Sequence, residues 1–307
     1  MTFDGVRPVL HVPFGPEPDE KVLHPELRAL VRAMLEANVR GLVVLGLASE
    51  AWALRQAERD EVLARLAEEL AGRAPFGVGI EGSTQVAIAR ARAAARAGAA
   101  GLMVLPPPTA QSGEALARHF AEVAEAAALP ILVQDSPQVT GVTLTVDGLL
   151  ALARAHPLVQ AVKVEVAGAG AKASGVRAGG MDVVSGWGGL HYLESIERGA
   201  VGCMPGCDLG PAFVEIDRLA REGTPGAAAA AKALYDSLLP LLLYEAQSLD
   251  LLVLGAKRLL RRNGIFGSGR LRQPGRELDP VESASLDRLM DDLAERRVPG
   301  FAAQVVA

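Results

Sequence analysis

The chain has 307 residues, half of which are hydrophobic, and its 36 acidic residues outnumber its 31 lysines and arginines to give a net charge of −5. This length can bury a large core, and one α/β barrel of ordinary size with an appendage would use all of it. The acidic balance argues against nucleic-acid binding, because such binding needs a surplus of basic residues to neutralise phosphates.

The N-terminal segment, the length of the apolar runs and the number of cysteines predict no export signal, membrane span or metal site. The first ten residues, MTFDGVRPVL, lack the basic run and apolar stretch of a signal peptide. Apolar runs such as 238–243 are far shorter than the roughly 20 residues that span a bilayer. Cys203 and Cys207 are too few for a disulfide framework or a four-ligand zinc site. We therefore expect a cytoplasmic protein without a metal or cofactor.

Short β-rich runs alternate with helical patterns from near the N-terminus to about residue 222. This alternation predicts parallel strands joined by helices, and several strands are apolar throughout, as expected when both faces of a sheet are covered. Eight strands favour a closed (β/α)₈ TIM barrel. The predicted strands are 6–12, 41–47, 76–80, 101–105, 130–134, 161–166, 182–185 and 200–204.

Helical spacing and capping residues support the same order of elements. Apolar residues recur every three or four positions from Leu27 to Leu35, and Pro25 suits the first turn of that helix. From residue 223 onward the strand signal ceases and helical patterns dominate. We therefore predict a barrel over 1–222 and a helical extension over 223–307, packed on the barrel. Expected helix boundaries are Ser83 and Ser112 before helices, and Gly72 and Gly98 after them.

The segment AVKVEV, residues 161–166, carries two charges inside an apolar strand. Side chains alternate across a strand, so Val162, Val164 and Val166 share one face, and Lys163 and Glu165 share the other. The valine face suits packing under helices, which turns the charged face into the barrel. A desolvated lysine is a better amine nucleophile near neutral pH, and imine formation with a carbonyl substrate requires such an amine.

Two alternatives for these charges stay open. Lys163 and Glu165 could instead form a buried ion pair that serves the fold alone, or extend to the barrel rim. For Glu165, orientation of the lysine and catalytic acid–base work have equal support from the sequence.

Taken in order, several segments resemble the dihydrodipicolinate synthase/N-acetylneuraminate lyase family over most of the chain. No single segment decides the matter, but the ordered set is specific. The segments are PVLHVPF, GLVVLGLASE, GLMVLPPP, LPILVQDSPQVTG, AVKVE, GAVGCMPG and the late RQP at 272–274.

The resemblance implies roles for particular residues. Lys163 matches the lysine that forms the Schiff base, and Gly46, Ala48 and Ser49 lie in the loop that matches the binding segment for the substrate carboxylate. Backbone N–H groups of that loop, with the Ser49 hydroxyl, would form an anion nest. Met204 would contact the keto acid through its backbone. Trp187 either walls the pocket or packs in the core.

The chain also departs from the family pattern. Gln134 stands where the family has a proton-shuttling tyrosine, and glutamine does not titrate. Leu47 and Ala48 replace the two threonines of the carboxylate loop, and the threonine at the Leu47 position relays to that tyrosine.

Further departures affect assembly and substrate. Pro108 and Thr109 replace an aromatic pair that reaches into a neighbouring subunit. Val139 replaces the arginine that binds the aldehyde substrate in the synthase proper, which disfavours lysine biosynthesis. Another group must then move protons, and the ionisable candidates near strand ends are Glu165, Glu81, Asp135, Glu50 and His191.

The sequence thus favours a class I aldolase-type lyase, either an aldolase or a dehydratase, in which Lys163 condenses with a pyruvate-like 2-oxo acid. Gln134 would bind substrate, and Leu47, Glu81, Asp135 and Trp187 are further pocket candidates. The alternative from another class is a ligand-binding barrel that kept the pocket and lost catalysis. A metal-dependent aldolase is a third hypothesis. By the resemblance, we expect a homodimer or homotetramer.

Overall fold

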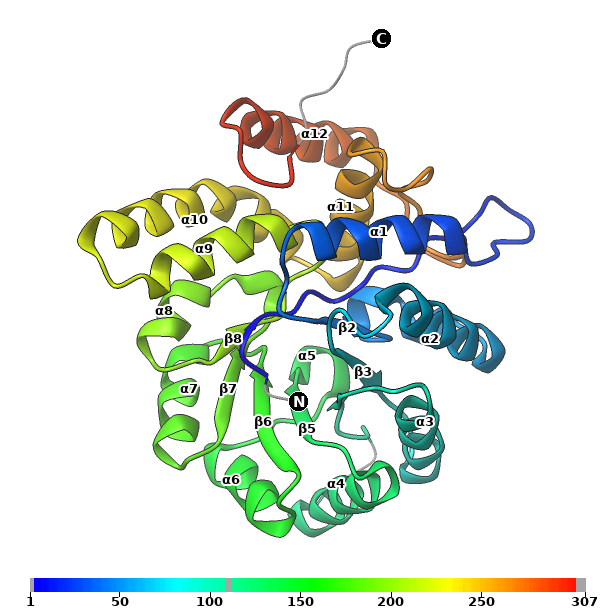
Figure 1. Cartoon of the computed structure of the whole chain (residues 1–307), viewed down its shortest axis with the longest axis vertical. Coiled ribbons are helices and arrows are strands. Elements are labelled where there is room, and N and C mark those ends of the chain that lie inside the picture. Colours follow the sequence, from blue (N-terminus) through cyan, green and yellow to red (C-terminus); the bar gives the residue numbers. More distant parts are fainter. Residues whose placement is uncertain (1–2, 109–111, 302–307) are drawn as a thin grey trace.

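The computed structural model describes residues 3–108 and 112–301, so Thr109 lies outside the described residues. Parallel strands form a ring with helices around it (Figure 1). The strands are β1 (Gly5–Val6), β2 (Leu42–Val44), β3 (Phe76–Ile80), β4 (Gly101–Val104), β5 (Ile131–Asp135), β6 (Val159–Val164), β7 (Asp182–Ser185) and β8 (Gly202–Cys203).

Every strand pairs in parallel with its neighbour in the order β1-β8-β7-β6-β5-β4-β3-β2. The remaining gap, between β1 and β2, is closed by the chain that continues from β1: Val9 forms parallel bridges to both Val43 and Gly206. The N–H of Leu10 donates to the Val43 carbonyl at 2.8 Å. The predicted (β/α)₈ barrel is confirmed, although β1 and β8 are shorter than the sequence indicated.

Each strand leads through a loop to helices that cover the outside of the barrel. Pro25 lies in the first turn of α1 and the Ser112 hydroxyl caps α4, both as predicted. The helices over the barrel are α1 (His24–Glu36), α2 (Gln56–Leu70), α3 (Thr84–Arg96), α4 (Gly113–Ala127), α5 (Pro137–Thr140), α6 (Val146–Ala155), α7 (Ala169–Ala178), α8 (Tyr192–Glu197) and α9 (Gly210–Arg221).

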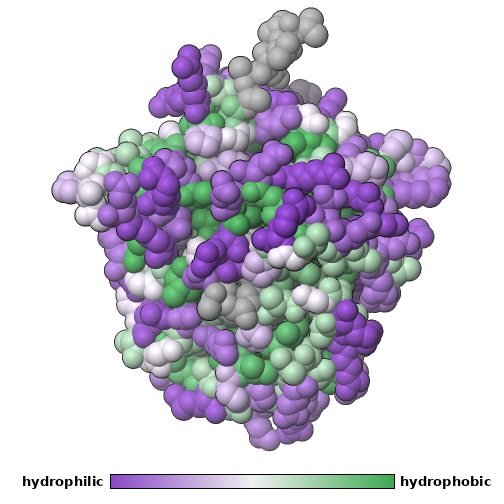
Figure 2. Space-filling view, viewed as in Figure 1, coloured by the Kyte–Doolittle hydropathy of each residue, from purple (hydrophilic) through white to green (hydrophobic). Residues whose placement is uncertain are grey.

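The hydrophobic core has an inner and an outer layer. Inside the ring, Val9, Met103, Leu132 and Ala161 belong to one buried cluster. Between ring and helices lies a larger cluster, which includes Val162, Val164 and Val166. The alternation predicted for the sixth strand is therefore confirmed. On the face shown in Figure 2, hydrophilic side chains line most of the outline, with hydrophobic groups between them.

Three further helices, α10 (Pro225–Glu245), α11 (Leu249–Arg262) and α12 (Pro280–Glu295), gather on one side of the barrel (Figure 1). Among the described residues, α10 alone is long and apolar enough to cross a membrane by length and composition. It packs along α9, contacts α11 and α12, and buries Leu238 and Leu241 completely. The helix buries one face against its neighbours, and a third of its apolar window is buried. The boundary at residue 222 stays a prediction.

The extension is tied to the barrel by buried charges. Lys257 of α11 forms an ion pair with Glu50, in the loop after β2, and both side chains are almost fully buried. The Lys257 Nζ also donates to the Arg270 carbonyl at 3.0 Å and lies 4.4 Å from the centre of the Phe14 ring. Beside it, the N–H of Arg272 donates to Glu50 Oε2 at 2.9 Å. The C-terminal segment thus holds the loop that follows β2.

We predict that Lys257→Met lowers the free energy of unfolding by about 3–5 kcal/mol, because the Glu50 carboxylate would remain buried without its counterion. Urea unfolding followed by circular dichroism measures this. The control is Lys232→Met, which breaks an exposed pair with Asp236 and should cost less than about 1 kcal/mol. Equal losses in the two variants would contradict the role assigned to the buried pair.

Candidate active site

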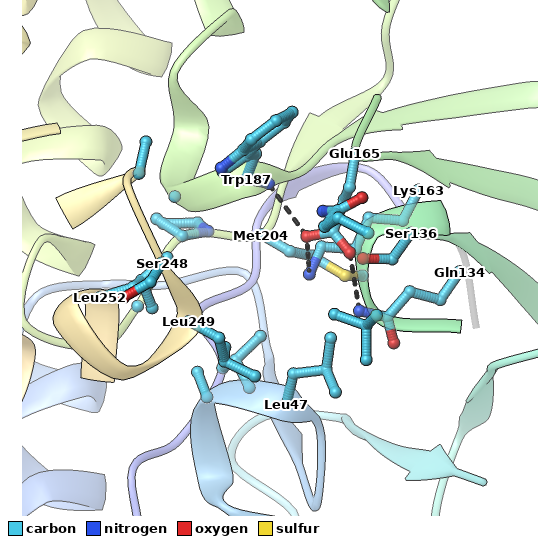
Figure 3. A pocket seen from close by; sticks show the side chains of 18 of the residues that line it. Leu47, Gln134, Ser136, Lys163, Glu165, Trp187, Met204, Ser248, Leu249 and Leu252 are labelled. Carbon is cyan, nitrogen blue, oxygen red and sulfur yellow. Dashed lines mark hydrogen bonds and ion pairs between the residues drawn. The ribbon is translucent and has the colours of Figure 1, made fainter. Parts of the chain in front are cut away.

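A cavity of about 380 Å³ lies where the carboxyl ends of the strands meet the extension. Its walls come from the end of β5, the end of β6, the loops after β2, β7 and β8, and the turn between α10 and α11. Figure 3 shows Lys163 and Glu165 on one side of this space and Ser248, Leu249 and Leu252 on the other. Active sites of this fold form at this end of the barrel.

Lys163 is in register with Gln134 of β5 and Val184 of β7, so the pairing of three strands sets its position. Its Nζ lies 3.0 Å from Glu165 Oε1. Both side chains are buried and both line the cavity. The sequence left a purely structural ion pair and a functional lysine as alternatives. The structure is compatible with both, because Lys163 pairs with Glu165 and also lines the cavity.

Glu165 has three donors around its carboxylate. The Gln134 amide donates to Oε2 at 2.7 Å, and the N–H of Trp187 donates to Oε1 at 2.9 Å, which Lys163 also contacts. Burial alone would raise the pKa of Glu165, but the Lys163 charge and these hydrogen bonds outweigh it and hold the pKa below its ordinary value. Glu165 is therefore an oriented carboxylate, able to accept a proton.

The loop after β2 begins with a short 3₁₀ turn, Leu47–Ser49. The Ser49 N–H closes that turn on the Gly46 carbonyl at 3.0 Å, so the unpaired donors of the turn are the N–H groups of Leu47 and Ala48. Leu47 and Ala48 line the cavity. Backbone donors at this position suit an anion such as a carboxylate.

Two residues predicted to bind substrate do not line the cavity. The Ser49 side chain is buried behind the turn, and its hydroxyl donates to the Leu10 carbonyl. A side chain at Gly46 would meet Met103 at 2.8 Å, which shows that this position packs on the inner core. Both residues shape the loop and are not cavity groups.

Two further pocket candidates were wrong. Glu81 lies outside the cavity lining and forms ion pairs with Arg59 and Arg90. Asp135 alternates with Gln134, so it faces the helices, where it pairs with Lys172 of α7. Burial raises the pKa of Asp135, and the Lys172 charge opposes that effect. In contrast, Gln134, Leu47, Ala48, Trp187 and Met204 all line the cavity as predicted.

Sequence reasoning missed four polar cavity residues. Ser136 could have been found, because it shares a strand face with Gln134 two positions away. Gln138 follows it in α5. Gln247 and Ser248 come from the turn between α10 and α11, and only the packing of the extension brings them to the site.

Among the ionisable side chains buried outside the cavity lining are His11, Asp208 and Glu245. The ring of His11 contacts the Ala48 carbonyl through Nδ1 at 2.9 Å and Asp208 Oδ1 through Nε2 at 3.3 Å. Glu245, at the end of α10, is also buried, and its Oε1 has no hydrogen-bond partner within the described part of the chain. Burial and the nearby Asp208 raise the pKa of Glu245 well above its ordinary value, so this carboxyl favours its neutral form.

The described part of the chain contains no cluster of side chains that could bind a metal ion together. Over residues 3–108 and 112–301, no three His, Cys, Asp or Glu side chains are grouped closely enough to hold an ion. Cys203 and Cys207 are buried thiols, and burial raises the pKa of both.

The sequence and the fold were compared with known proteins. The family model described as the dihydrodipicolinate synthetase family matches residues 2–294. An L-2-keto-3-deoxyarabonate dehydratase from Azospirillum brasilense is 34% identical over 308 residues, which cover 95% of this chain and 96% of the relative. A 4-hydroxy-tetrahydrodipicolinate synthase from Xanthomonas axonopodis pv. citri (strain 306) is 32% identical and covers 95% of each chain.

Solved structures agree with this family match. A dihydrodipicolinate synthase from Rhodopseudomonas palustris superposes with a TM-score of 0.86 at 27% identity, over 94% of this chain and 97% of that one. The 4-hydroxy-tetrahydrodipicolinate synthase of Methylacidiphilum fumariolicum SolV gives a TM-score of 0.87 at 25% identity, over 96% and 99%.

We predict that Glu245→Gln becomes more stable relative to the natural protein as the pH rises from about 5 to 9. A carboxyl whose pKa is raised by folding stabilises the protein below its unfolded pKa, and that stability is lost as the pH rises toward the folded pKa. Urea unfolding at several pH values measures the difference, which can grow by at most about 1.4 kcal/mol per pH unit. The exposed control Glu114→Gln, whose partner Arg118 stays charged over this pH range, should show no such trend, and parallel curves for Glu245→Gln would refute the prediction.

Proposed function

Because the chain belongs to the dihydrodipicolinate synthetase family, and is a Schiff-base lyase of the class I aldolase type, we propose that Lys163 is its imine-forming residue. A single observation carries this proposal: the Nζ of Lys163 lies on the wall of a 380 Å³ cavity beside a carboxylate that can take its proton. The substrate we propose is a 2-oxo acid, whose carboxylate would meet the N–H groups of Leu47 and Ala48.

For the reaction we propose dehydration of a 2-oxo-3-deoxy acid that carries a hydroxyl on C4. The 34% identity with an enzyme named L-2-keto-3-deoxyarabonate dehydratase supports this choice. So does Val139, which stands where the resemblance places the arginine that binds the aldehyde substrate in the synthase proper, because valine supplies no charge for that substrate.

Each step of this reaction has a group in the site. Glu165 accepts the proton that Lys163 gives up, and the free amine attacks C2 of the keto acid. Glu165 returns that proton to the C2 oxygen, and the loss of this oxygen as water leaves an iminium, which withdraws electrons from C3. Glu165 takes a proton from C3 to form the enamine, and then returns it to the C4 hydroxyl as the C4–O bond breaks. Water hydrolyses the imine, so the net change is the loss of one water from the substrate.

Glu165 is suited to both halves of this proton transfer. Its lowered pKa makes it a carboxylate at neutral pH, as a base requires. Gln134 and the Trp187 N–H hold the carboxylate within 3.0 Å of the Lys163 Nζ, next to the carbons that react. Gln134 thus orients the group that replaces the missing tyrosine, and does not itself move protons.

Location and assembly are proposals that rest on the family resemblance. We place the protein in the cytoplasm and expect a homodimer or homotetramer. Pro108 stands where the family carries part of an aromatic pair that reaches into the neighbouring subunit, so no cross-subunit contact of that kind is proposed.

The first test of the function is reductive trapping. Incubation with pyruvate and borohydride should add one reduced pyruvate adduct to the intact mass, and Lys163→Ala should lose the adduct. Lys232→Ala, at an exposed lysine, should keep it. A protein that melts at a higher temperature with pyruvate but traps no mass would be a binding barrel, and imine formation would be refuted.

The second test separates imine formation from proton transfer. We predict that Glu165→Gln traps pyruvate more slowly than the natural protein but still to one adduct, because water can take the lysine proton in place of the carboxylate. Its kcat for dehydration should fall by about 10²–10⁴, because the amide keeps the shape of the carboxylate and removes the base at C3. A coupled assay of dehydration measures kcat, with Glu114→Gln on the exposed face of α4 as control. An unchanged kcat would assign the proton transfer to another group.

A further inference from the structure

Ser136 is a buried hydroxyl on the cavity wall that the proposed steps do not use. It follows β5, shares the inward face with Gln134, and is only 1% exposed. Figure 3 shows its side chain close to Lys163 and Glu165. Within the described part of the chain, its Oγ has no hydrogen-bond partner.

The local backbone explains why this hydroxyl is unpaired. Ser136 is the N-cap residue of α5, where a serine side chain ordinarily accepts a hydrogen bond from an N–H of the first turn. The N–H groups of Val139 and Thr140 instead donate to the Ser136 carbonyl, both at 3.1 Å. The hydroxyl is therefore left for the cavity.

A buried hydroxyl without a partner is unfavourable, and a bound ligand would remove that cost. A hydroxyl both donates and accepts, so it can pair with a hydroxyl of a ligand in either direction. The hydroxyl of Ser136 and the carboxylate of Glu165 lie on the same wall of the cavity. A ligand group that binds Ser136 therefore also lies near Glu165.

The charges of the cavity restrict the rest of the ligand. Among the described residues that line it, Lys163 and Glu165 are the only ionisable ones, and they neutralise each other. The remaining polar lining consists of neutral groups such as Gln138 and Ser248. A second carboxylate or a phosphate on the substrate would thus lose its hydration without gaining a cation.

We propose that Ser136 binds a hydroxyl of the substrate and thereby selects 2-oxo acids with an uncharged, hydroxylated tail over those with a second anionic group. The inference rests on the proposed function, because it places the keto carbon of the same substrate at Lys163. It adds a substrate-binding residue and a substrate class to that site.

The test uses three 2-oxo acids of five carbons: L-2-keto-3-deoxyarabonate, 2-oxopentanoate without hydroxyls, and 2-oxoglutarate with a second carboxylate. Ser136→Ala should lower kcat/KM for the first about tenfold, the usual effect of losing one neutral hydrogen bond. It should trap pyruvate and 2-oxopentanoate as fast as the natural protein. The natural protein should bind 2-oxoglutarate more weakly than L-2-keto-3-deoxyarabonate.

A structural role for Ser136 would give another pattern. The melting temperature of Ser136→Ala should stay the same or rise, because no hydrogen bond within the protein is lost. The matched control is Ser112→Ala, which removes an N-cap hydroxyl bonded to the Ala115 N–H and should lower the melting temperature without changing kcat/KM. Equal losses for all substrates in Ser136→Ala, or tighter binding of 2-oxoglutarate, would overturn the proposal.

Calorimetry in the Lys163→Ala background distinguishes this inference from imine formation. There L-2-keto-3-deoxyarabonate binds without a covalent bond, and adding Ser136→Ala should raise its Kd about tenfold. An unchanged Kd overturns the role of Ser136 whether or not the natural protein traps a keto acid. A failure of trapping with an intact effect of Ser136 on Kd would instead refute the Schiff base and leave the hydroxyl site standing.

Discussion

The buried pair of Lys163 and Glu165 is the constraint on which the site depends. Two charges out of water are tolerated only when each is paired and the remaining oxygens accept hydrogen bonds. The carboxylate meets that condition through Gln134 of β5 and the Trp187 N–H after β7, and both lie next to β6 in the ring. Barrel closure therefore orients the amine and its base together, with open space on the other side.

The extension completes the site and does not merely cover the barrel. Its turn between α10 and α11 supplies the wall opposite Lys163, and Lys257 holds the loop after β2 through Glu50. The backbone donors of that loop, at Leu47 and Ala48, are thereby kept facing the cavity. His11 adds a second support, since it contacts the Ala48 carbonyl from the interior. Two buried polar groups thus hold this turn from two sides.

The loss of the family tyrosine has a physical counterpart in the structure. Gln134, which the resemblance places at that position, donates its amide to Glu165, two residues after Lys163. Under the proposed function, Glu165 is the acid–base group. The cavity that results contains one neutralised ion pair and otherwise neutral polar groups. Such a lining suits a substrate whose only charge is its α-carboxylate.

The fold and the chemical centre followed from local patterns. Period-two alternation placed Lys163 and Glu165 inward and three valines outward, and the order of strands and helices predicted the barrel; pairing and packing confirm both. The same alternation along β5 places Gln134 and Ser136 on the cavity side and Asp135 on the helix side. Glu81 was predicted to line the pocket because it follows a strand. In the structure it pairs instead with Arg59 and Arg90, which belong to other elements.

By itself the sequence determined which residues share a face of a strand and what chemistry they carry, because alternation depends on the backbone alone. It could not determine that Glu50 pairs with Lys257, that Ser49 turns away from the cavity, or that Gln247 and Ser248 reach it. Those contacts join residues far apart in the chain, or depend on which of several local partners a polar group finds. The tertiary structure decided them, since only packing brings the extension against the barrel and assigns each buried polar group its partner.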